Sequence, residues 1–338
     1  MTTKAETIKP DTTRPKTALI CGVSGQDAAY LARHLLSLGY EVVGTSRDAA
    51  VGSFANLTKL GIRDRVRVTS CSLKDFRSII RVLEEVSPSE IYNLAGQTSV
   101  GLSFEQPVEA LESIALGTLN LLEAIRFYNR QLRFYNACSS ECFCDTHGMP
   151  ATENTPFNPR SPYAVAKAAA FWHVRGYREA YGMYACSGIL FNHESPLRPE
   201  RFVTQKVVAA ACRIADEGAG RLRLGDLSVR RDWGWAPEYV EAMWRMVQQE
   251  QPTDFVICTG QTESLSAFVE EAFAAVGLSW KDHVDEDRSL FRPGDIRSSA
   301  GTAAKARELL GWTARYRMRD VARAMVSAAR ASAPKSDV

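Results

Sequence analysis

The sequence predicts an α/β fold, in which a doubly wound parallel sheet is followed by a smaller, mostly helical C-terminal region. Two observations support this class. From Thr17 to residue 191, short β-branched runs alternate with helical patterns, and such alternation is typical of a parallel sheet with helical crossovers. After Asn192 the alternation becomes irregular and helical patterns dominate.

Each expected element follows from its local pattern. Short apolar runs bounded by turn residues predict strands at 17–22, 41–46, 65–70, 90–96, 133–139 and 183–191. Helical periodicity predicts helices between them at 26–39, 75–86, 108–129 and 161–182. In the second half we expect helices at 202–217, 237–249, 265–276, 302–310 and 318–329, with short strands at 221–225 and 254–259.

These elements suggest a division of the chain. Residues 1–16 are polar, lack the apolar core of a signal peptide and are expected to form a disordered tail. Residues 17–191 would form the sheet domain, with segments near 230–260 returning to it. Residues 192–330 would mainly form a second region that covers the substrate.

Composition excludes several classes of protein. A chain of 338 residues with 45% hydrophobic and 24% charged residues is not mostly disordered. It contains no apolar run of about 18 residues, so no membrane span is expected. A net charge of +2 argues against a nucleic-acid partner. The eight cysteines are scattered without a zinc-type cluster, which favours reduced thiols in the cytoplasm and no metal site.

The junction of the first strand and the first helix carries Gly22 and Gly25. Glycine lets the backbone turn tightly and approach a pyrophosphate, whose charge is favoured at a helix N-terminus. The spacing Gly-x-x-Gly-x-x-Ala departs from the usual Gly-x-Gly-x-x-Gly, so an ordinary loop is the alternative. Its place at the first strand–helix junction favours dinucleotide binding, and hence a Rossmann sheet.

The end of the second strand bears on which dinucleotide is bound. Arg47 follows this strand, and a guanidinium there can pair with the 2′-phosphate of NADP. Asp48 comes next and could instead accept hydrogen bonds from the ribose of NAD. The sequence therefore favours NADP and leaves NAD open.

A second group of residues points to redox chemistry. Tyr163 and Lys167 stand four residues apart on one face of the helix expected at 161–182. A lysine beside a phenol favours the phenolate and should lower the phenol's pKa, so that the tyrosine can take a hydroxyl proton. Ser139 and Glu141 follow the fifth strand. All four side chains could reach the carboxyl edge of the sheet, where the reactive end of the dinucleotide would lie.

The longer motifs resemble those of the extended short-chain dehydrogenases/reductases, specifically the GDP-mannose 4,6-dehydratase family. The resemblance runs from about Ala18 to the final helix. The stretches that carry it are GVSGQD (22–27), IYNLAGQTSVGLSFEQP (91–107), SSECF (139–143), TPFNPRSPYAVAKAAAFW (155–172), GILFNHESP (188–196), RFVTQK (201–206), RRDWGWAPEYVEAMW (230–244) and FVICTGQ (255–261).

The resemblance implies a reaction and a set of catalytic residues. Tyr163, assisted by Lys167, would remove the proton of the C4 hydroxyl of a GDP-bound hexose while NADP takes the hydride. Glu141 would remove the C5 proton and Ser139, at a position where the family usually has threonine, would help to orient or relay protons. Water would leave from C6 and the hydride would return there, giving a 4-keto-6-deoxy sugar.

The resemblance also implies binding residues. Those matching the family's cofactor site are Gly22, Gly25, Gln26, Asp27, Arg47, Leu73, Leu94, Ala95, Gly96, Gln97, Lys167, His193 and Arg198. Those matching groups that hold GDP are Asn192, Lys206, Arg231 and Arg292. Ser72 stands where the family commonly has an aspartate near the adenine, and the segment 48–62 is shorter than usual.

Several alternatives stay open from the sequence. GDP-manno-heptose would share every motif with GDP-mannose as the substrate. A 4-keto-reductase or epimerase on the same fold keeps the tyrosine and lysine but does not require Glu141, which argues against it. A non-catalytic nucleotide-sugar sensor has no direct support, because the catalytic side chains are present. The helices at 108–129 and 161–181 match those that pair subunits in this fold, so a homodimer or homotetramer is expected.

Overall fold

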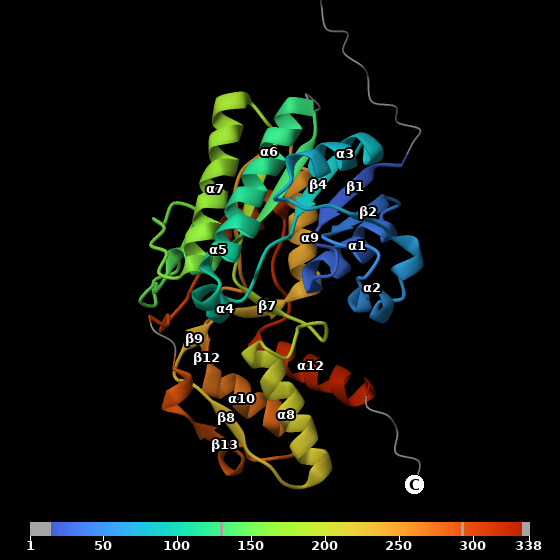
Figure 1. Ribbon diagram of the computed structural model, residues 1–338. Helices are drawn as coiled ribbons and strands as arrows, with labels where there is room; N and C mark the ends of the chain where they lie inside the picture. The colour runs from blue at the N-terminus through green and yellow to red at the C-terminus, as the bar shows by residue number, and fades with distance from the viewer. Residues whose placement is uncertain (1–14, 129–130, 292–293, 333–338) are drawn as a thin grey trace, which may run out of the picture.

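The computed structural model describes residues 15–128, 131–291 and 294–332. Its main sheet has seven strands, all paired in parallel, in the order β11-β6-β5-β4-β1-β2-β3 (Figure 1). The strands are β1 (Thr17–Cys21), β2 (Glu41–Ser46), β3 (Arg67–Ser70), β4 (Glu90–Asn93), β5 (Arg133–Ser139), β6 (Ala185–Leu190) and β11 (Phe255–Ile257). The winding reverses between β1 and β4, which opens a crevice at the carboxyl ends of these strands. The predicted doubly wound parallel sheet is confirmed.

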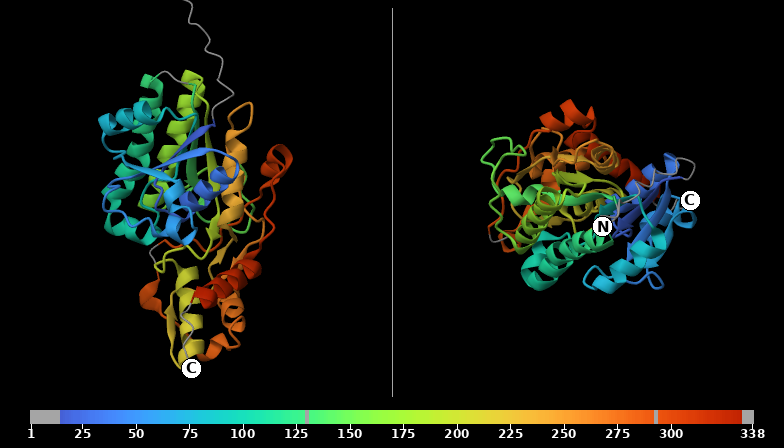
Figure 2. Two further views of the ribbon diagram at one scale, coloured as in Figure 1. Left: turned by 90° about the vertical axis from the view of Figure 1, so that its right-hand side faces the viewer. Right: turned by 90° about the horizontal axis from the view of Figure 1, so that it is seen from above.

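Helices cover both faces of this sheet (Figures 1 and 2). One face carries α1 (Gln26–Ser37) and α9 (Ala236–Val247), and the other carries α3 (Phe76–Val86), α6 (Gly117–Tyr128) and α7 (Pro162–Tyr181). The strands are apolar on both sides for this reason, since alternate residues point to opposite faces. In β1, Ile20 belongs to the α1/α9 core, whereas Leu19 belongs to the α3/α6 core.

Several boundaries differ from the expectations. The helix expected at 108–129 consists of α5 (Pro107–Ala110), a π-helical segment η2 (Leu111–Leu116) and α6, and its expected end at Asn129 lies outside the described residues. The strand expected at 65–70 begins only at Arg67, because 63–65 form a 3-10 turn. Two short helices that we did not expect are α2 (Ala55–Lys59) and α4 (Val100–Glu105).

The strand expected at 183–191 stops at Leu190, and the chain then leaves the main sheet. Residues Asn192–Glu194 form β7, which pairs with β10 (Trp233–Trp235). This small parallel pair carries the chain from the sheet layer toward the C-terminal region (Figure 1). The exit at Leu190 therefore brings the segment after the sixth strand to the carboxyl edge of the sheet.

The C-terminal region is mostly helical, as predicted, and lies below the sheet layer in Figure 1. Its apolar core joins α8 (Val203–Glu217), α10 (Leu265–Ala274) and α12 (Met318–Ser332) through Ile214, Phe268 and Val321. Two strand pairs complete it: β8 (Leu222–Leu224) with β13 (Val284–Glu286), and β9 (Arg230–Arg231) with β12 (Glu263–Ser264). Between these segments the chain returns to the sheet layer as α9 and β11, followed later by α11 (Ala304–Leu310).

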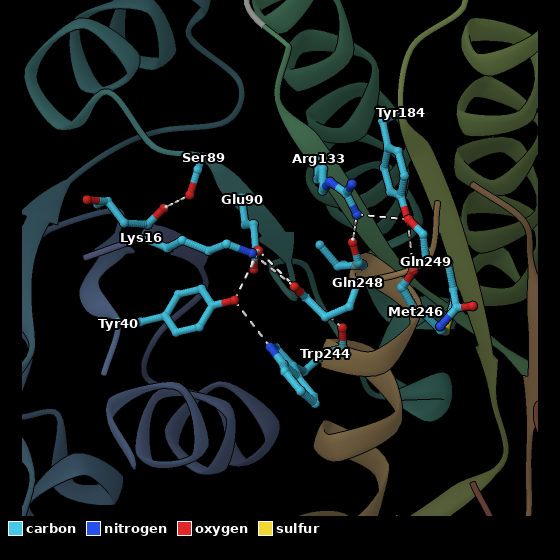
Figure 3. A network of polar contacts seen from close by, with 12 residues as sticks. Lys16, Tyr40, Ser89, Glu90, Arg133, Tyr184, Trp244, Met246, Gln248 and Gln249 are labelled. Carbon is cyan, nitrogen blue, oxygen red and sulfur yellow. Dashed lines mark hydrogen bonds and ion pairs between the residues drawn. The ribbon is translucent and has the colours of Figure 1, made fainter. Parts of the chain in front are cut away.

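The amino ends of the strands are tied together by a buried carboxylate, Glu90, which is 1% exposed (Figure 3). It accepts hydrogen bonds from Lys16 Nζ at 3.2 Å, Tyr40 Oη at 3.1 Å and Gln248 Nε2 at 3.2 Å. Tyr92 Oη donates a fourth bond at 2.8 Å. Buried charge is tolerated only when it is paired and hydrogen-bonded, and here these bonds fasten the start of β1 and the end of α9 to β4. Of the expected tail, 1–16, only Pro15 and Lys16 are described.

Candidate active site

The end of β5 and the start of α7 bring four of the expected side chains to one place. Ser139 is the last residue of β5, and its Oγ accepts a hydrogen bond from the Glu141 amide at 3.2 Å, which caps the 3-10 turn η3 (Ser140–Phe143). Ser161 caps α7 by accepting from the Ala164 amide, and Pro162 occupies the first helical position. Tyr163 therefore lies in the first turn of α7, with Lys167 one turn further on the same face.

Lys167 is held by the sheet and not by Tyr163. Its Nζ donates a hydrogen bond of 2.6 Å to the carbonyl of Ala137 in β5, and it lies 5.9 Å from the centre of the Tyr163 ring. Both side chains are buried, Tyr163 at 8% and Lys167 at 6% exposure. The carbonyl of Ala137 in β5 thus holds the Lys167 ammonium beside the Tyr163 ring.

Burial has the largest effect on the pKa of both side chains. It raises the pKa of Tyr163, an effect that the Ser139 side chain opposes and Glu141 reinforces. Burial also lowers the pKa of Lys167. Burial is the largest influence on the pKa of Tyr163 and acts in the direction opposite to that expected of Lys167, so the expectation that Lys167 lowers this pKa stays a prediction.

The turn between β1 and α1 packs directly against the segment that follows β4. Gly22 has φ +84°, and its amide and that of Val23 both donate to the carbonyl of Thr45. A Cβ at Gly22 would lie 2.8 Å from Ala95 Cα, so only glycine fits. No side chain of the described residues caps α1 at Gly25, and the first helical hydrogen bond comes from Ala29. The backbone amides of Gln26, Asp27 and Ala28, which precede Ala29 in the first turn of the helix, are thus available to an anion, and the turn fits the pyrophosphate of a dinucleotide.

Side chains of the same turn hold the segment after β7. Gln26 accepts a hydrogen bond from Ser195 Oγ at 2.7 Å and donates to the carbonyl of His193 at 3.2 Å. Asp27 Oδ2 lies 2.9 Å from His193 Nε2, and His193 stacks on Tyr239 with a 4.5 Å centroid distance. Burial alone would raise the pKa of Asp27, but His193, together with Gln26 and Arg198, outweighs burial and lowers the pKa to about 2. The side-chain amide of Gln26 is occupied by these internal contacts. Only the backbone N–H of Gln26 is therefore left to bind an anion.

The remaining cofactor candidates follow the ends of β2, β3 and β4. Arg47 is 84% exposed and its Nη1 lies 3.6 Å from Glu109 Oε1, so the guanidinium stands at the surface beside α5. Leu73 is buried in the α3/α6 core. Leu94 and Ala95 follow β4, then Gly96 and Gln97; the last is held by hydrogen bonds with the backbone of Ser99. Ser72 donates its amide to Ser78 Oγ at 3.2 Å.

A cavity of about 280 Å³ lies where the carboxyl edge of the sheet meets the C-terminal region. The expected site residues that line it are Asp27, Leu94, Ser139, Glu141, Tyr163, Lys167, Asn192, His193, Arg198 and Arg231. The tertiary structure therefore brings together both catalytic elements, the first turn of α1 and β7, which are far apart in the sequence.

Other expected residues stand away from this cavity or cannot be placed. Gly22, Gly25 and Gln26 lie in the adjoining turn, while Arg47, Leu73 and the run Ala95, Gly96 and Gln97 lie along the strand ends. Lys206 is on α8, where its Nζ donates to the carbonyl of Arg223 at 2.9 Å. Arg292 lies outside the described residues.

Two arginines of the cavity already have carboxylate neighbours. Arg231 Nη2 lies 3.1 Å from Asp295 Oδ1, and its Nη1 donates to the carbonyl of Ile296 at 2.6 Å. Arg198 Nε lies 3.0 Å from Glu194 Oε2, and its guanidinium covers the Phe202 ring at 3.9 Å. These neighbours hold both guanidinium groups at the wall, where they can meet the diphosphate of a nucleotide.

Sequence reasoning missed several residues that line the cavity. They include Thr98, Ser99, Ser140, Arg201, Asp226 and Asp295. Four of them fall within quoted motifs (91–107, 139–143 and 201–206), so the motifs were the available signal. Asp226 and Asp295 lie in irregular segments without such a signal. Across the described ranges, no cluster of three or more His, Cys, Asp or Glu side chains could hold a metal ion.

Neighbouring proteins of known structure share this architecture. A UDP-glucose 4-epimerase complexed with NAD from Thermus thermophilus superposes with a TM-score of 0.82 at 26% identity, covering 94% of this chain and 100% of its own. The RMD protein of Pseudomonas aeruginosa, complexed with NADPH, has a TM-score of 0.75 at 22% identity and covers 92% and 98%. At 22% identity, the likeness to the RMD protein shows the fold alone. Within the described segments, no helix is long and apolar enough to cross a membrane.

Sequence comparison is more specific. GDP-mannose 4,6 dehydratase 1 of Arabidopsis thaliana is 44% identical over 321 residues, which cover 92% of this chain and 89% of that protein. GDP-mannose 4,6-dehydratase of Sinorhizobium fredii is 43% identical over 335 residues, covering 92% and 95%. Residues 19–325 match the family described as GDP-mannose 4,6 dehydratase. The chain belongs to the GDP-mannose 4,6 dehydratase family of nucleotide-sugar hydro-lyases.

Proposed function

We propose that this enzyme converts GDP-mannose to the GDP-4-keto-6-deoxy sugar, with NADP as its resident cofactor. The observation that carries the proposal is the meeting of Tyr163, Lys167 and Glu141 in one cavity at the carboxyl edge of the sheet. The tyrosine and lysine suit oxidation of an alcohol, and the added carboxylate suits removal of a carbon-bound proton. The names of relatives at 43–44% identity support the same substrate.

The roles of the side chains follow from their positions. Tyr163 acts as the base in its phenolate form, which the neighbouring Lys167 ammonium stabilises, and becomes a neutral phenol when it accepts the proton of the C4 hydroxyl. Glu141 then removes the C5 proton, which the new ketone has made acidic, so that water can leave from C6. Ser139, whose side chain interacts with Tyr163, relays the proton. When bound, the cofactor supplies reversible hydride acceptance.

The residues that would hold the cofactor are those around the β1–α1 turn. The free amides at the start of α1 would bind the pyrophosphate, and Leu94 and His193 would line the nicotinamide side. NADP is preferred to NAD because Arg47 is 84% exposed next to the end of β2 and can turn to a 2′-phosphate. On the substrate side, Asn192 and Arg231 would meet the GDP moiety, whereas Arg198 would lie on the cofactor side.

Turnover of defined substrates tests the reaction. We expect GDP-mannose, incubated with the purified enzyme and NADP, to lose one water molecule by mass spectrometry. Glu141→Gln should abolish elimination while cofactor binding persists. Parallel incubation with GDP-manno-heptose tests the heptose alternative, and GDP-4-keto-6-deoxymannose with NADPH tests the reductase alternative. If only the last is turned over, the dehydratase proposal fails.

Calorimetric titration tests the cofactor preference. Arg47→Ala should weaken NADP binding about tenfold and leave NAD binding unchanged. Arg67→Ala is the matched control, because Arg67 begins the neighbouring strand and pairs with Glu85 at 3.2 Å. Equal losses for NADP and NAD in Arg47→Ala would show that Arg47 does not read the 2′-phosphate.

We also propose that a second copy of the chain covers the face formed by α6, η2 and α7; α6 and α7 lie side by side in Figure 1, and η2 contacts both. Large apolar side chains are exposed there: Leu111 at 50%, Phe127 at 74%, Val165 at 48% and Trp172 at 54%. A surface of this kind usually marks an interface. Light scattering after chromatography should give a dimer or tetramer for the native chain, and Val165→Glu with Trp172→Glu should give a monomer.

A further inference from the structure

Two buried cysteines, Cys138 and Cys142, flank the short segment that carries Ser139 and Glu141. Cys138 precedes Ser139 in β5 and is 3% exposed, and Cys142 follows Glu141 in η3 and is fully buried. Their Sγ atoms lie 3.8 Å apart. Cys138 is also one of the residues that line the 280 Å³ cavity.

We propose that Cys138 and Cys142 are a redox-sensitive thiol pair, and that their oxidation to a disulfide inactivates the enzyme. The loss of activity rests on the proposed function, whereas formation of the disulfide does not. The eight cysteines are all free thiols in the structure. Disulfides in a reducing compartment are usually transient or redox-sensing, which is the role inferred here.

The chemistry needs a peroxide as the oxidant. The Cys138 sulfur attacks the O–O bond of hydrogen peroxide, which is reduced and leaves as water after proton transfer, while the thiol becomes a sulfenic acid. The Cys142 sulfur then attacks that sulfenic sulfur, the S–S bond forms, and the hydroxyl leaves as a second water with the Cys142 proton. In total two thiols lose two electrons and two protons to one peroxide.

The geometry explains why such a bond would disturb catalysis. A disulfide requires a sulfur–sulfur distance of about 2.05 Å, much shorter than the present separation of 3.8 Å. At present both thiols rest on α7: Cys138 Sγ lies 3.9 Å from the Lys167 carbonyl, and Cys142 Sγ 3.6 Å from the Ala164 carbonyl. Drawing the sulfurs together shifts the turn that carries Ser139 and Glu141 relative to this helix.

Burial sets the sensitivity of the pair. It raises the pKa of the Cys142 thiol well above its ordinary value, an effect that Cys138 reinforces. A thiol reacts as its thiolate, so Cys142 is a slow nucleophile until Cys138 has been oxidised beside it. We therefore expect the pair to respond to sustained peroxide and to stay reduced otherwise.

Mapping of the disulfide tests the proposal in the whole enzyme. Trypsin releases residues 134–160 as one peptide, which contains Cys138, Cys142 and Cys144. After peroxide we expect this peptide to be two hydrogen atoms lighter, with fragment ions that link Cys138 to Cys142. Dehydratase activity should fall at least tenfold in parallel and return with dithiothreitol.

Two variants show whether the disulfide forms between Cys138 and Cys142 or involves Cys144. Cys144→Ser is the matched control and should behave as the wild-type enzyme. Cys142→Ser should form no linkage, and dimedone should label Cys138 instead. The proposal is overturned if Cys144 supplies the linkage, if no linkage forms, or if the linked enzyme keeps full activity. An untreated enzyme that turns over no nucleotide sugar would refute the proposed function, and the mass of the peptide would still decide whether the pair forms.

Discussion

His193 Nε2 and Asp27 Oδ2 lie 2.9 Å apart, in a contact that joins the first turn of α1 to β7 across 166 residues of sequence. The His193 Nδ1 lies 2.7 Å from the Phe191 carbonyl, so both ring nitrogens are engaged. Asp27 and His193 also line the cavity. This pair therefore links the cofactor turn to the segment that leaves the sheet.

The pair should make stability depend on pH. Against the effect of burial, His193, together with Gln26 and Arg198, lowers the pKa of Asp27 to about 2, so the carboxylate's contribution is complete above the unfolded pKa near 3.9 and is lost as pH falls toward 2. Burial acts to lower the pKa of His193, but Asp27 outweighs burial and raises it. The stabilisation from protonated His193 is therefore complete below its unfolded pKa of about 6.5 and is lost as the pH rises through the folded pKa. Both contributions describe one interaction and do not add.

We therefore expect His193→Asn to cost about 2 kcal/mol of unfolding free energy between about pH 4 and 6.5, and less outside this range. Urea unfolding at pH 3, 5 and 8 measures the profile. His147→Asn is the control, because His147 is 86% exposed beside Asp145. A cost for His193→Asn that does not vary with pH would contradict the pairing.

Gly22 and Gly39 allow steric collision to be separated from backbone strain. Both have positive φ, +84° and +82°, but a Cβ at Gly22 would meet Ala95 Cα at 2.8 Å, whereas nothing lies within 4 Å of one at Gly39. Gly39→Ala should cost about 1 kcal/mol for strain alone. Gly22→Ala should cost roughly 1–3 kcal/mol more and weaken cofactor binding. Thermal unfolding and calorimetry measure both, and equal losses at the two sites would argue against the close packing of the turn.

Arg178 and Asp254 form a largely buried, bidentate ion pair that fixes α7 to the start of β11. Arg178 Nη1 and Nη2 donate to the two carboxylate oxygens at 2.9 and 2.6 Å, and Asp254 also accepts from the Ser187 amide. Arg178→Ala should cost about 3–5 kcal/mol, because an unpaired carboxylate would stay buried. Arg175→Ala, which breaks an exposed pair with Glu179 on the same helix, should cost less than about 1 kcal/mol. Chemical denaturation measures the unfolding free energy of both variants, and similar losses for Arg178→Ala and Arg175→Ala would contradict this prediction.

Glu90→Gln tests the network in Figure 3. A neutral amide keeps the shape but cannot accept all four donors, so we expect a loss of about 1–3 kcal/mol in unfolding free energy. Glu85→Gln on the exposed side of α3 should change it by less than about 1 kcal/mol. The two variants can be compared by urea unfolding, and a Glu90→Gln variant as stable as the wild type would show that the network adds nothing.

The positions of most elements could be predicted because they depend on local patterns. Alternating apolar runs located β2 and β5 at their observed bounds, and Ser161 and Gly182 mark the ends of α7 as capping residues do. The short helix α4 escaped prediction because it has only six residues and its start depends on the Ser99 cap. The exit of the chain at Leu190 also escaped, since β7 exists only through its pairing with β10.

By itself, the sequence determined the doubly wound sheet, the glycine turn and the motifs of the nucleotide-sugar dehydratases. Only the tertiary structure decided which side chains meet. It placed Asp27 against His193, gave Gln26 internal partners in place of a free side chain, set Cys138 beside Cys142, and buried Tyr163 so that its pKa rises. The physical reason is that partners and desolvation depend on how distant segments pack, whereas helices, strands and turns follow from neighbouring residues.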